Sequence, residues 1–371
     1  MKKYLYRVGL FLIPLVLYIM IALVVNPYGI LGLKGIIPER SVYKGLSVGN
    51  KYSSLNTAIM KLAKLENTDC KRFIVGDSRS QWLESDTLIK YTNCEYLNMG
   101  IPGGTYLEAL DVIDIIRDKN LPEEILWVAS FYHLTFSNDK RENRITQAYK
   151  TINNPVKSLF TKHYILAVYN VIDIYIHAKL DAEKTYLGSF SKLNPIPDKI
   201  NKSIIEIWRG ESTPFVRYPF DSYFNNIYDS ISFDNVSPSF KKLIPKVQQN
   251  SKRHRFHDCT KKRLTSLISD IQKENLNIVF FSFPNSVFYN KILAKTDFQP
   301  VYDSFISTMD SIGLVLYAEF PNDFTLETEN YSDIFHLRMR EYGFYTKCIV
   351  VPDTNYVKKI DNMVVKVISY T

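Results

Sequence analysis

Residues 73–80, Phe-Ile-Val-Gly-Asp-Ser-Arg-Ser, are the stretch from which the fold of this chain is inferred. Three apolar residues end at Gly76, a pattern typical of a short buried strand that delivers the chain into a turn. Ser78 then lies just before a helix-like segment, where unpaired backbone N–H groups and the helix dipole stabilise negative charge. An oxyanion formed on a carbonyl group attacked by Ser78 is favoured in such surroundings. The stretch therefore predicts a strand, a turn and a nucleophile.

A second segment, residues 333–336 (Asp-Ile-Phe-His), supplies the groups that such a serine needs. The imidazole of His336 can accept the hydroxyl proton and return it to the leaving group. Asp333 lies on the same side of a turn, where its carboxylate can fix the imidazole tautomer. Each segment also has a plain structural interpretation, with Asp or Ser of the first as a helix N-cap. Their order, one after an early strand and one before a final helix-like segment, favours catalysis.

In these two segments the chain resembles the SGNH/GDSL superfamily of hydrolases and acyltransferases, whose first block is Gly-Asp-Ser and whose last is Asp-x-x-His. Residues 98–105, Asn-Met-Gly-Ile-Pro-Gly-Gly-Thr, are similar to the family's second block. There a glycine lends its backbone N–H to the oxyanion hole, and Gly103 matches it best, followed by Gly104. The resemblance covers residues 70–140 and 255–350.

The third block departs from the family pattern. The predicted strand ends in Phe131, where family hydrolases carry Gly-x-Asn-Asp, so the asparagine of the oxyanion hole is missing. A third donor then has to come from elsewhere, and Ser130 and His133 are candidates for it. The missing asparagine favours acyl transfer over hydrolysis, because an acyl-enzyme shielded by a lid excludes water and admits a sugar hydroxyl.

Asp77 and Arg79 flank the candidate nucleophile. Asp77 is expected to cap the helix or to brace the oxyanion loop, which is a supporting role. Arg79 opposes the helix dipole by about 0.3–1 kcal/mol if it is exposed. It is therefore expected to have a task, either an ion pair with an acidic side chain or contact with an anionic substrate.

The N-terminus predicts a membrane anchor. Residues 8–25 carry no charged side chain and, as a helix, are long enough to cross a bilayer of ~30 Å. The alternative is a cleaved signal peptide, whose apolar core is normally shorter and is followed by a small-x-small cleavage site. The basic residues precede the apolar run, so the positive-inside rule places everything after Asn26 outside the cytoplasm, in the periplasm or at the cell surface.

Strand-like and helix-like segments alternate as in parallel α/β proteins. The predicted strands are 72–76, 95–99, 124–130, 278–283 and 313–318, and the predicted helices are 79–90, 105–119, 260–274 and 298–311, with another at 55–65. The resemblance makes this a three-layer α/β/α, flavodoxin-like SGNH fold with a mainly parallel sheet. We expect an anchor at 1–26, a connector at 27–70, the α/β domain at 71–136 and 255–371, and an inserted lid or substrate-binding region at 137–254.

The expected insertion contains an aromatic and arginine mixture that suits sugar rings or acidic groups. Trp208 and Arg209 are its candidate substrate contacts, and ordinary packing explains them equally well. The apolar segment at 164–178 is expected to be a buried helix, because Asp173 and His177 interrupt it and it is short for a membrane span.

The four cysteines show no Cys-x-x-Cys spacing and the histidines are not clustered, so no metal and no cofactor is expected. Cys70 and Cys94 precede two predicted strands and either form a disulfide or remain free thiols. The net charge of +8 comes mostly from scattered lysines, and no basic block is interleaved with aromatics, so nucleic acid is not an expected partner.

Anchored members of the superfamily that this chain is similar to, including alginate O-acetylation and teichoic acid D-alanine transfer proteins, act on envelope polymers. The resemblance therefore implies an extracytoplasmic serine O-acyltransferase or carbohydrate esterase that acts on a cell-envelope polysaccharide through acyl-Ser78. A multispanning membrane acyltransferase is an implied partner. The alternative is a non-catalytic protein that keeps the SGNH scaffold to bind glycan or that membrane partner.

Overall fold

The computed structural model of the 371-residue chain describes the helices, the strands and most of the short connections between them. The described residues are 2–31, 36–37, 42, 46, 52–83, 85–120, 122–128, 143–180, 238–251, 258–274, 276–282, 286–294, 300, 304 and 314–317. The chain divides into two compact units, which are described separately. Unit 1 comprises residues 1–69 and 140–192, and unit 2 comprises residues 70–139 and 193–371.

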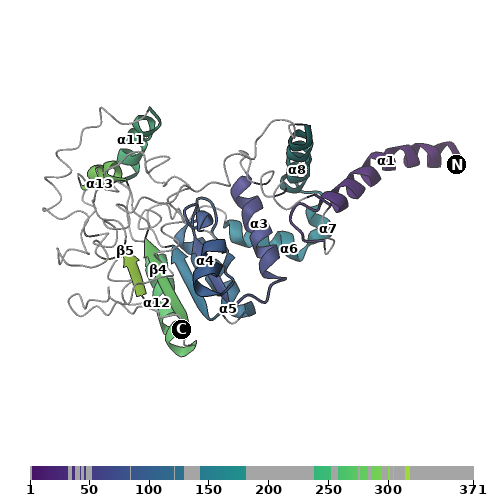
Figure 1. The fold of residues 1–371 in the computed structure, drawn as a ribbon. Helices are drawn as coiled ribbons and strands as arrows, with labels where there is room; N and C mark the ends of the chain where they lie inside the picture. Colours follow the sequence, from purple (N-terminus) through teal and green to yellow (C-terminus); the bar gives the residue numbers. More distant parts are fainter. Residues whose placement is uncertain are drawn as a thin grey trace. The chain divides into compact units, whose positions relative to one another are not determined.

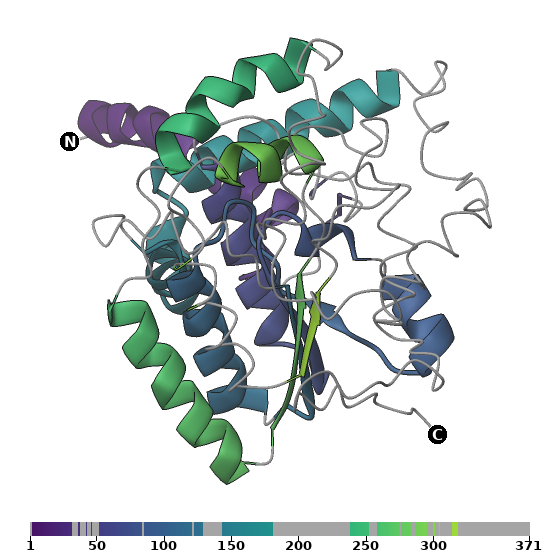
Figure 2. The same cartoon turned by 90° about the vertical axis from the view of Figure 1, so that its left-hand side faces the viewer.

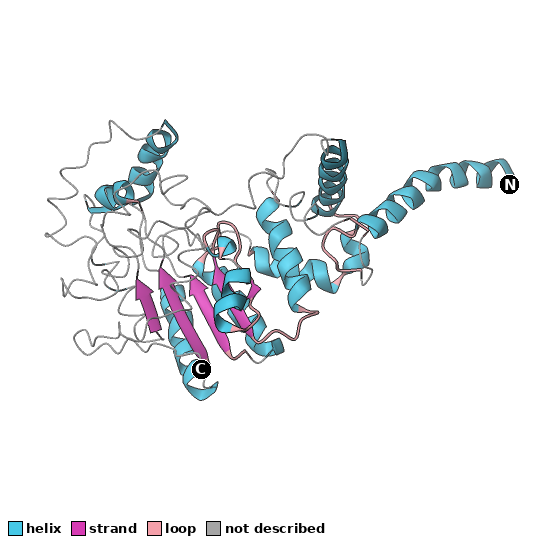
Figure 3. Ribbon diagram, viewed as in Figure 1, coloured by secondary structure: helices cyan, strands magenta, loops and turns pink. Residues whose placement is uncertain are grey.

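Unit 2 is built on a parallel β-sheet, so the α/β class expected from the sequence is confirmed. The five strands in the described part of the sheet have the order β2-β1-β3-β4-β5 and all run in the same direction (Figure 3). This is the order of a doubly wound sheet whose connections reverse direction between β1 and β3. Their bounds are β1 Arg72–Gly76, β2 Leu97–Asn98, β3 Glu124–Val128, β4 Asn277–Ser282 and β5 Leu314–Tyr317.

Helices cover both faces of this sheet. The connection from β1 to β2 moves toward one edge through α4 (Ser85–Thr92), whereas α5 (Tyr106–Asn120) leads back to β3 and α12 (Asp258–Glu274) leads on to β4. Right-handed connections therefore place α4 on one face and α5 and α12 on the other, as Figure 2 shows. α11 (Pro238–Ser251) packs against α13 (Val287–Ala294) in the same unit (Figure 1).

The strands bury nearly all of their side chains, as strands covered on both faces do. Phe73, Ile74 and Val75 of β1 are buried, and every residue of β3 is buried. Glu124 begins β3 and links it to the start of β2, beyond β1, and to the neighbouring strand β4. It accepts hydrogen bonds from the Tyr96 hydroxyl before β2 (2.6 Å) and from the Asn277 amide of β4 (3.2 Å).

In unit 2 one sequence expectation is wrong, and one open alternative is decided. The continuous helix at 79–90 is absent, because a short 3-10 turn, η1 (Ser80–Trp82), is followed by extended backbone at Leu83 before α4 begins. The side chain of Leu83 is buried, which fixes this break in the helix. Cys70 and Cys94 are free thiols and form no disulfide. The Cys70 sulfur lies within hydrogen-bond distance of two carbonyl oxygens, those of Arg72 (3.1 Å) and Glu95 (3.3 Å), and its single S–H can donate to either of them.

Unit 1 is helical and combines segments from the expected anchor, connector and insertion. Its described helices are α1 (Lys2–Val25), α3 (Ser53–Leu65), α6 (Arg144–Asn153), α7 (Pro155–Ser158) and α8 (Lys162–Leu180). α3 packs against α6, and α1 packs against α8. Neither the pairing of α3 with α6 nor the existence of α6 was expected from the sequence.

A cluster of aromatic and polar side chains lies inside unit 1. The Tyr28 hydroxyl donates to Asn56 Oδ1 (2.6 Å), and the Tyr28 ring contacts the rings of Tyr164 and His163. His163 Nε2 also lies 3.4 Å from the Thr151 hydroxyl oxygen. Burial lowers the pKa of His163 from its usual value, so this imidazole is neutral at pH 7.

Two helices have exposed apolar residues: α1, which was expected to lie in lipid, and α8, which was expected to be buried. Helix α8 contains the segment 164–178, as expected, and buries one side of it, whereas the other side is exposed. In α1, six consecutive residues, 12–17, are all exposed. Among the residues that the structure describes, no helix combines the length and the hydropathy that a membrane span requires.

Candidate active site

The candidate site begins where β1 ends, at Gly76. Its φ of +150° is a conformation that other residues rarely adopt. A Cβ atom added there would lie 2.8 Å from the Val128 carbonyl oxygen and 3.1 Å from Ser80 Cβ. Only glycine fits this position, because the turn after β1 passes directly against the end of β3.

A buried ion pair fixes the turn that follows. Asp77 and Arg79 are 2% and 3% exposed. One carboxylate oxygen of Asp77 accepts the Arg79 backbone N–H (2.7 Å), and the other lies 3.3 Å from Arg79 Nε. The Ser80 hydroxyl, which is fully buried, donates to the Asp77 carbonyl oxygen (2.7 Å). Asp77 thus holds the turn that carries Ser78, and Arg79 is engaged by an acidic side chain.

Ser78 lies between these two charged residues and is partly exposed. The neighbouring Ser80 is buried and its hydroxyl is already committed to Asp77, so Ser78 is the serine of this stretch that a substrate can reach. Helix-dipole stabilisation at Ser78, expected from the sequence, is not available from a helix as short as η1. An oxyanion at this serine would depend on individual N–H donors instead.

A second loop runs beside this turn and is tied to it by Asn98. The chain continues to pair with β1 beyond β2, because the backbone N–H groups of Met99 and Ile101 donate to Ile74 (2.7 Å) and Gly76 (2.9 Å). Asn98 Nδ2 donates to the Ser80 carbonyl oxygen (2.8 Å), and Asn98 Oδ1 accepts the Gly100 N–H (3.0 Å). One side chain therefore sets the spacing between the two loops of the site.

The two glycines expected to line the oxyanion hole lie in different surroundings. Gly103 is exposed, with a φ of +59°, and a Cβ added to it would meet nothing within 4 Å. Gly104 is buried, and its backbone N–H donates to the Ile101 carbonyl oxygen (2.9 Å). The N–H of Gly104 is therefore already used inside the loop, whereas Gly103 faces the surface.

The loop ends in a capping box that begins α5. The Thr105 N–H donates to the Glu108 carboxylate (2.9 Å), and the Glu108 N–H donates to the Thr105 hydroxyl (3.2 Å). These reciprocal bonds satisfy two N–H groups at the start of the helix. They hold the N-terminal turn of α5 in place beside the ends of β1 and β3.

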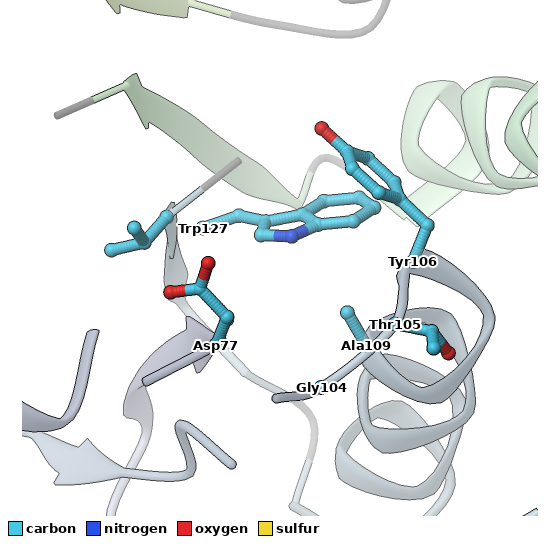
Figure 4. Close-up of a pocket in the computed structure, with 8 residues that line it drawn as sticks. Asp77, Gly104, Thr105, Tyr106, Ala109 and Trp127 are labelled. Atoms are coloured by element: carbon cyan, nitrogen blue, oxygen red, sulfur yellow. The ribbon is translucent and has the colours of Figure 1, made fainter. Parts of the chain in front are cut away.

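A small cavity lies at the point where the sheet reverses its connections. Its volume of about 10 Å³ is room for about one water molecule. Figure 4 shows the Trp127 ring between the Asp77 carboxylate and the Tyr106 ring, and the centroids of the two rings are 5.5 Å apart. Ligands of doubly wound sheets bind beyond the carboxyl ends of the strands at this point. The cavity is lined by Gly76, Asp77, Gly104, Thr105, Tyr106, Ala109, Trp127 and Val128.

Several predicted site residues lie outside the described part of the chain. These are the candidate base His336, its partner Asp333, the third-block residue His133, and Trp208 and Arg209 of the expected insertion. The structure thus brings together Asp77, Ser78 and the glycine loop of the second block. Among the residues described, no group of three or more His, Cys, Asp or Glu side chains is arranged as a metal site.

Sequence analysis missed Asn98, the Thr105–Glu108 capping box and the Trp127–Tyr106 pair. The capping box had a recognisable signal, Thr-x-x-Glu before an apolar run. Asn98 and Trp127 had none, because their roles depend on which strands are neighbours. No model of a known protein family matches the chain, and no curated protein matches it.

Proposed function

We propose that the chain is a membrane-anchored member of the SGNH/GDSL superfamily that transfers or hydrolyses O-acyl groups of a cell-envelope polysaccharide through acyl-Ser78. The observation that carries the proposal is the partial exposure of Ser78 on a turn whose flanking residues are buried and paired. The turn follows the carboxyl end of β1 in a doubly wound sheet, and ligands of such sheets bind beyond these strand ends. A nucleophile needs this combination of a rigid support and access.

The proposed reaction has two steps, and in each the acyl group passes from one oxygen to another while one proton moves through His336. In the first, Ser78 Oγ attacks the acyl carbonyl carbon, and His336 takes the hydroxyl proton and passes it to the departing alcohol as the ester bond breaks. In the second, an acceptor hydroxyl attacks acyl-Ser78, and its proton returns through His336 to Ser78. Asp333 holds the imidazole in the required tautomer.

The acceptor is proposed to be a sugar hydroxyl. Phe131 stands where family hydrolases carry the asparagine of the oxyanion hole, which favours transfer over hydrolysis. A multispanning membrane acyltransferase is the proposed source of the acyl group. An oligosaccharide incubated with an acyl donor and the chain should gain acyl mass, whereas release of the free acid alone would make the protein an esterase.

A fluorophosphonate probe tests the nucleophile. The full chain should be labelled at Ser78, and both Ser78→Ala and His336→Ala should abolish the labelling. Ser266→Ala is the matched control, because Ser266 is an exposed serine on α12 and its loss should leave labelling unchanged. Labelling that survives in Ser78→Ala contradicts the proposal.

The proposed location, outside the cytoplasm on an N-terminal anchor, is supported by residues 8–25 and by the exposure of α1. Residues 12–17 are apolar and exposed around the whole circumference of the helix, whereas a helix surrounded by water carries a polar face. Protease added to intact cells or spheroplasts should digest unit 2 and spare a tag placed before Lys2. Protection of unit 2 would overturn this location.

A second candidate is a non-catalytic envelope protein, and one observation favours it. The backbone N–H groups of Gly100, Ile101, Gly104 and Thr105 each donate to a partner within or next to the loop. Donors already bonded cannot stabilise an oxyanion without rearranging. Wild-type protein that binds envelope polysaccharide but takes no fluorophosphonate label would decide for this candidate.

A further inference from the structure

An exposed apolar face on α8 has no role in the proposed chemistry. Ile165, Tyr169 and Ile176 are exposed at spacings that place them on one side of the helix, and Tyr169 is 63% exposed. The buried face consists of Tyr164, Ala167, Val168 and Val171. Helix α8 therefore exposes a row of apolar side chains beside a polar pair with exposed side chains, Asp173 and His177, whereas a helix surrounded by water carries mainly polar residues on its outer side.

This face continues the exposed apolar surface of α1. The Tyr18 ring of α1 lies 6.3 Å from the ring of Phe160, and the Tyr18 hydroxyl donates to the Leu159 carbonyl oxygen. Phe160 is 51% exposed, directly before α8, and Val156 in α7 is exposed as well. The exposed apolar side chains of α7, α8 and the link between them make up what we name the unit 1 apolar face: Val156, Phe160, Ile165, Tyr169 and Ile176.

Charge around this face complements an anionic surface. The segment 143–180 contains five lysines and arginines but one acidic residue, Asp173. Lys157 and Lys162 are exposed and lie close to Phe160 in the sequence, three residues before it and two residues after it. Aromatic side chains combined with flanking basic residues are characteristic of helices that lie in the headgroup region of a bilayer.

We propose that the unit 1 apolar face lies on the membrane surface, with Lys157 and Lys162 in contact with anionic headgroups. The chain would then contact lipid at α1 and again along α7 and α8, and this second contact would restrict how unit 1 moves about its anchor. The inference depends on α1 lying in lipid but not on acyl transfer. Its failure can therefore be distinguished from a failure of the proposed chemistry.

An environment-sensitive fluorophore tests the proposal. The full chain, with its four native cysteines replaced by serine, is reconstituted into nanodiscs sized for one copy and carries an NBD group at Tyr169→Cys. The control is Thr265→Cys, an exposed position on α12 that the proposal leaves in water. We expect a several-fold rise in NBD emission with a blue shift, and quenching by spin-labelled lipid, at position 169 only.

The lipid composition separates the apolar from the electrostatic part. Discs containing phosphatidylglycerol should shield position 169 more than pure phosphatidylcholine discs, and the variant Lys157→Glu/Lys162→Glu should lose this difference. If position 169 is shielded equally in the two kinds of disc, the proposed contacts of Lys157 and Lys162 with anionic headgroups are overturned. Emission at 169 that equals emission at 265 overturns the proposal and assigns the face to a protein partner. Chain that does not elute with the discs overturns the anchor and the surface contact together.

Discussion

Unit 1 and unit 2 both bury charged side chains, and they stabilise them differently. In unit 2, Asp77 and Arg79 lie 3.3 Å apart, so each charge compensates the other. In unit 1, Lys61 on α3 is 6% exposed, and burial, with a smaller effect from Lys64, lowers its pKa to about 7. Desolvation and repulsion from Lys64 both disfavour the charged form of Lys61, whereas pairing supports the Asp77–Arg79 turn. Removal of a charge should therefore weaken unit 2 and strengthen unit 1.

The largest effect is expected for Asp77→Ala. This change leaves the Arg79 guanidinium buried without its carboxylate and removes the acceptor of the Arg79 N–H, which costs about 3–5 kcal/mol for a buried pair. Chemical denaturation followed by tryptophan fluorescence measures it, because all three tryptophans of the chain belong to unit 2.

The double variant Asp77→Leu/Arg79→Met is the matched control. It replaces both charges with apolar groups of similar size, and we expect it to recover most of the lost stability. If the double variant is as unstable as Asp77→Ala, shape rather than charge pairing holds the turn, and the comparison between the units fails.

Gly76→Ala should have the next largest effect, about 3 kcal/mol, because its Cβ would meet the Val128 backbone at 2.8 Å and its φ of +150° is unfavourable for alanine. Gly103→Ala is the control. A Cβ at Gly103 has open space, and only its φ of +59° is unfavourable, so it should cost about 1 kcal/mol. Equal losses in the two variants would show that β1 and β3 are not in such close contact.

Lys61→Met should remove a pH dependence from unit 1. The pKa of Lys61 is lowered from 10.5 to about 7 on folding. Between these values the unfolded chain binds more protons, so wild-type stability rises with pH, and it falls as pH drops toward 7. Across pH 7 to 9 the rise should be roughly 2 kcal/mol.

Denaturation followed by circular dichroism at 222 nm reports the helices of both units, including α3, which carries Lys61. The stability difference between Lys61→Met and wild type should be greatest at neutral pH and shrink toward pH 10. A difference that does not change with pH would mean that Lys61 keeps its ordinary pKa in the folded chain, with its charge as well compensated as that of Arg79.

The fold of unit 2 was predicted better from the sequence than the fold of unit 1, because the two units differ in how far apart in sequence their packed elements lie. In unit 2 each strand and its covering helix are neighbours in sequence, so alternating patterns located β1, β3, β4 and α12 to within a few residues. In unit 1, α3 packs against α6 across an interval that contains three strands of the sheet. Hydrophobic periodicity in a single sequence identifies a helix, but it does not identify the helix's distant partner.

Around the candidate site, the sequence correctly placed Gly-Asp-Ser at the end of a strand but misjudged the backbone that follows, and the roles of Ser78, Asp77 and the glycine loop stay predictions. Gly-Asp-Ser at a strand end is a local pattern, and the structure places it at the expected edge of the sheet. The break after η1 depends on the burial of Leu83, and the Asn98 bridge depends on β1 and β2 being neighbours. Both depend on tertiary contacts, which a local sequence pattern does not predict.

The smallest effect is expected at the partly exposed ion pairs between α5 and α12. Arg263 donates to the carboxylates of Asp111 and Asp114, but about one third of its side chain is exposed. Water and salt screen such a pair, so Arg263→Ala should cost only about 0.5–1 kcal/mol, and this cost should shrink in 0.5 M salt. Asp77→Ala should keep its cost in salt because its partner is buried. If both losses respond equally to salt in tryptophan-monitored denaturation, burial is not what distinguishes the two pairs.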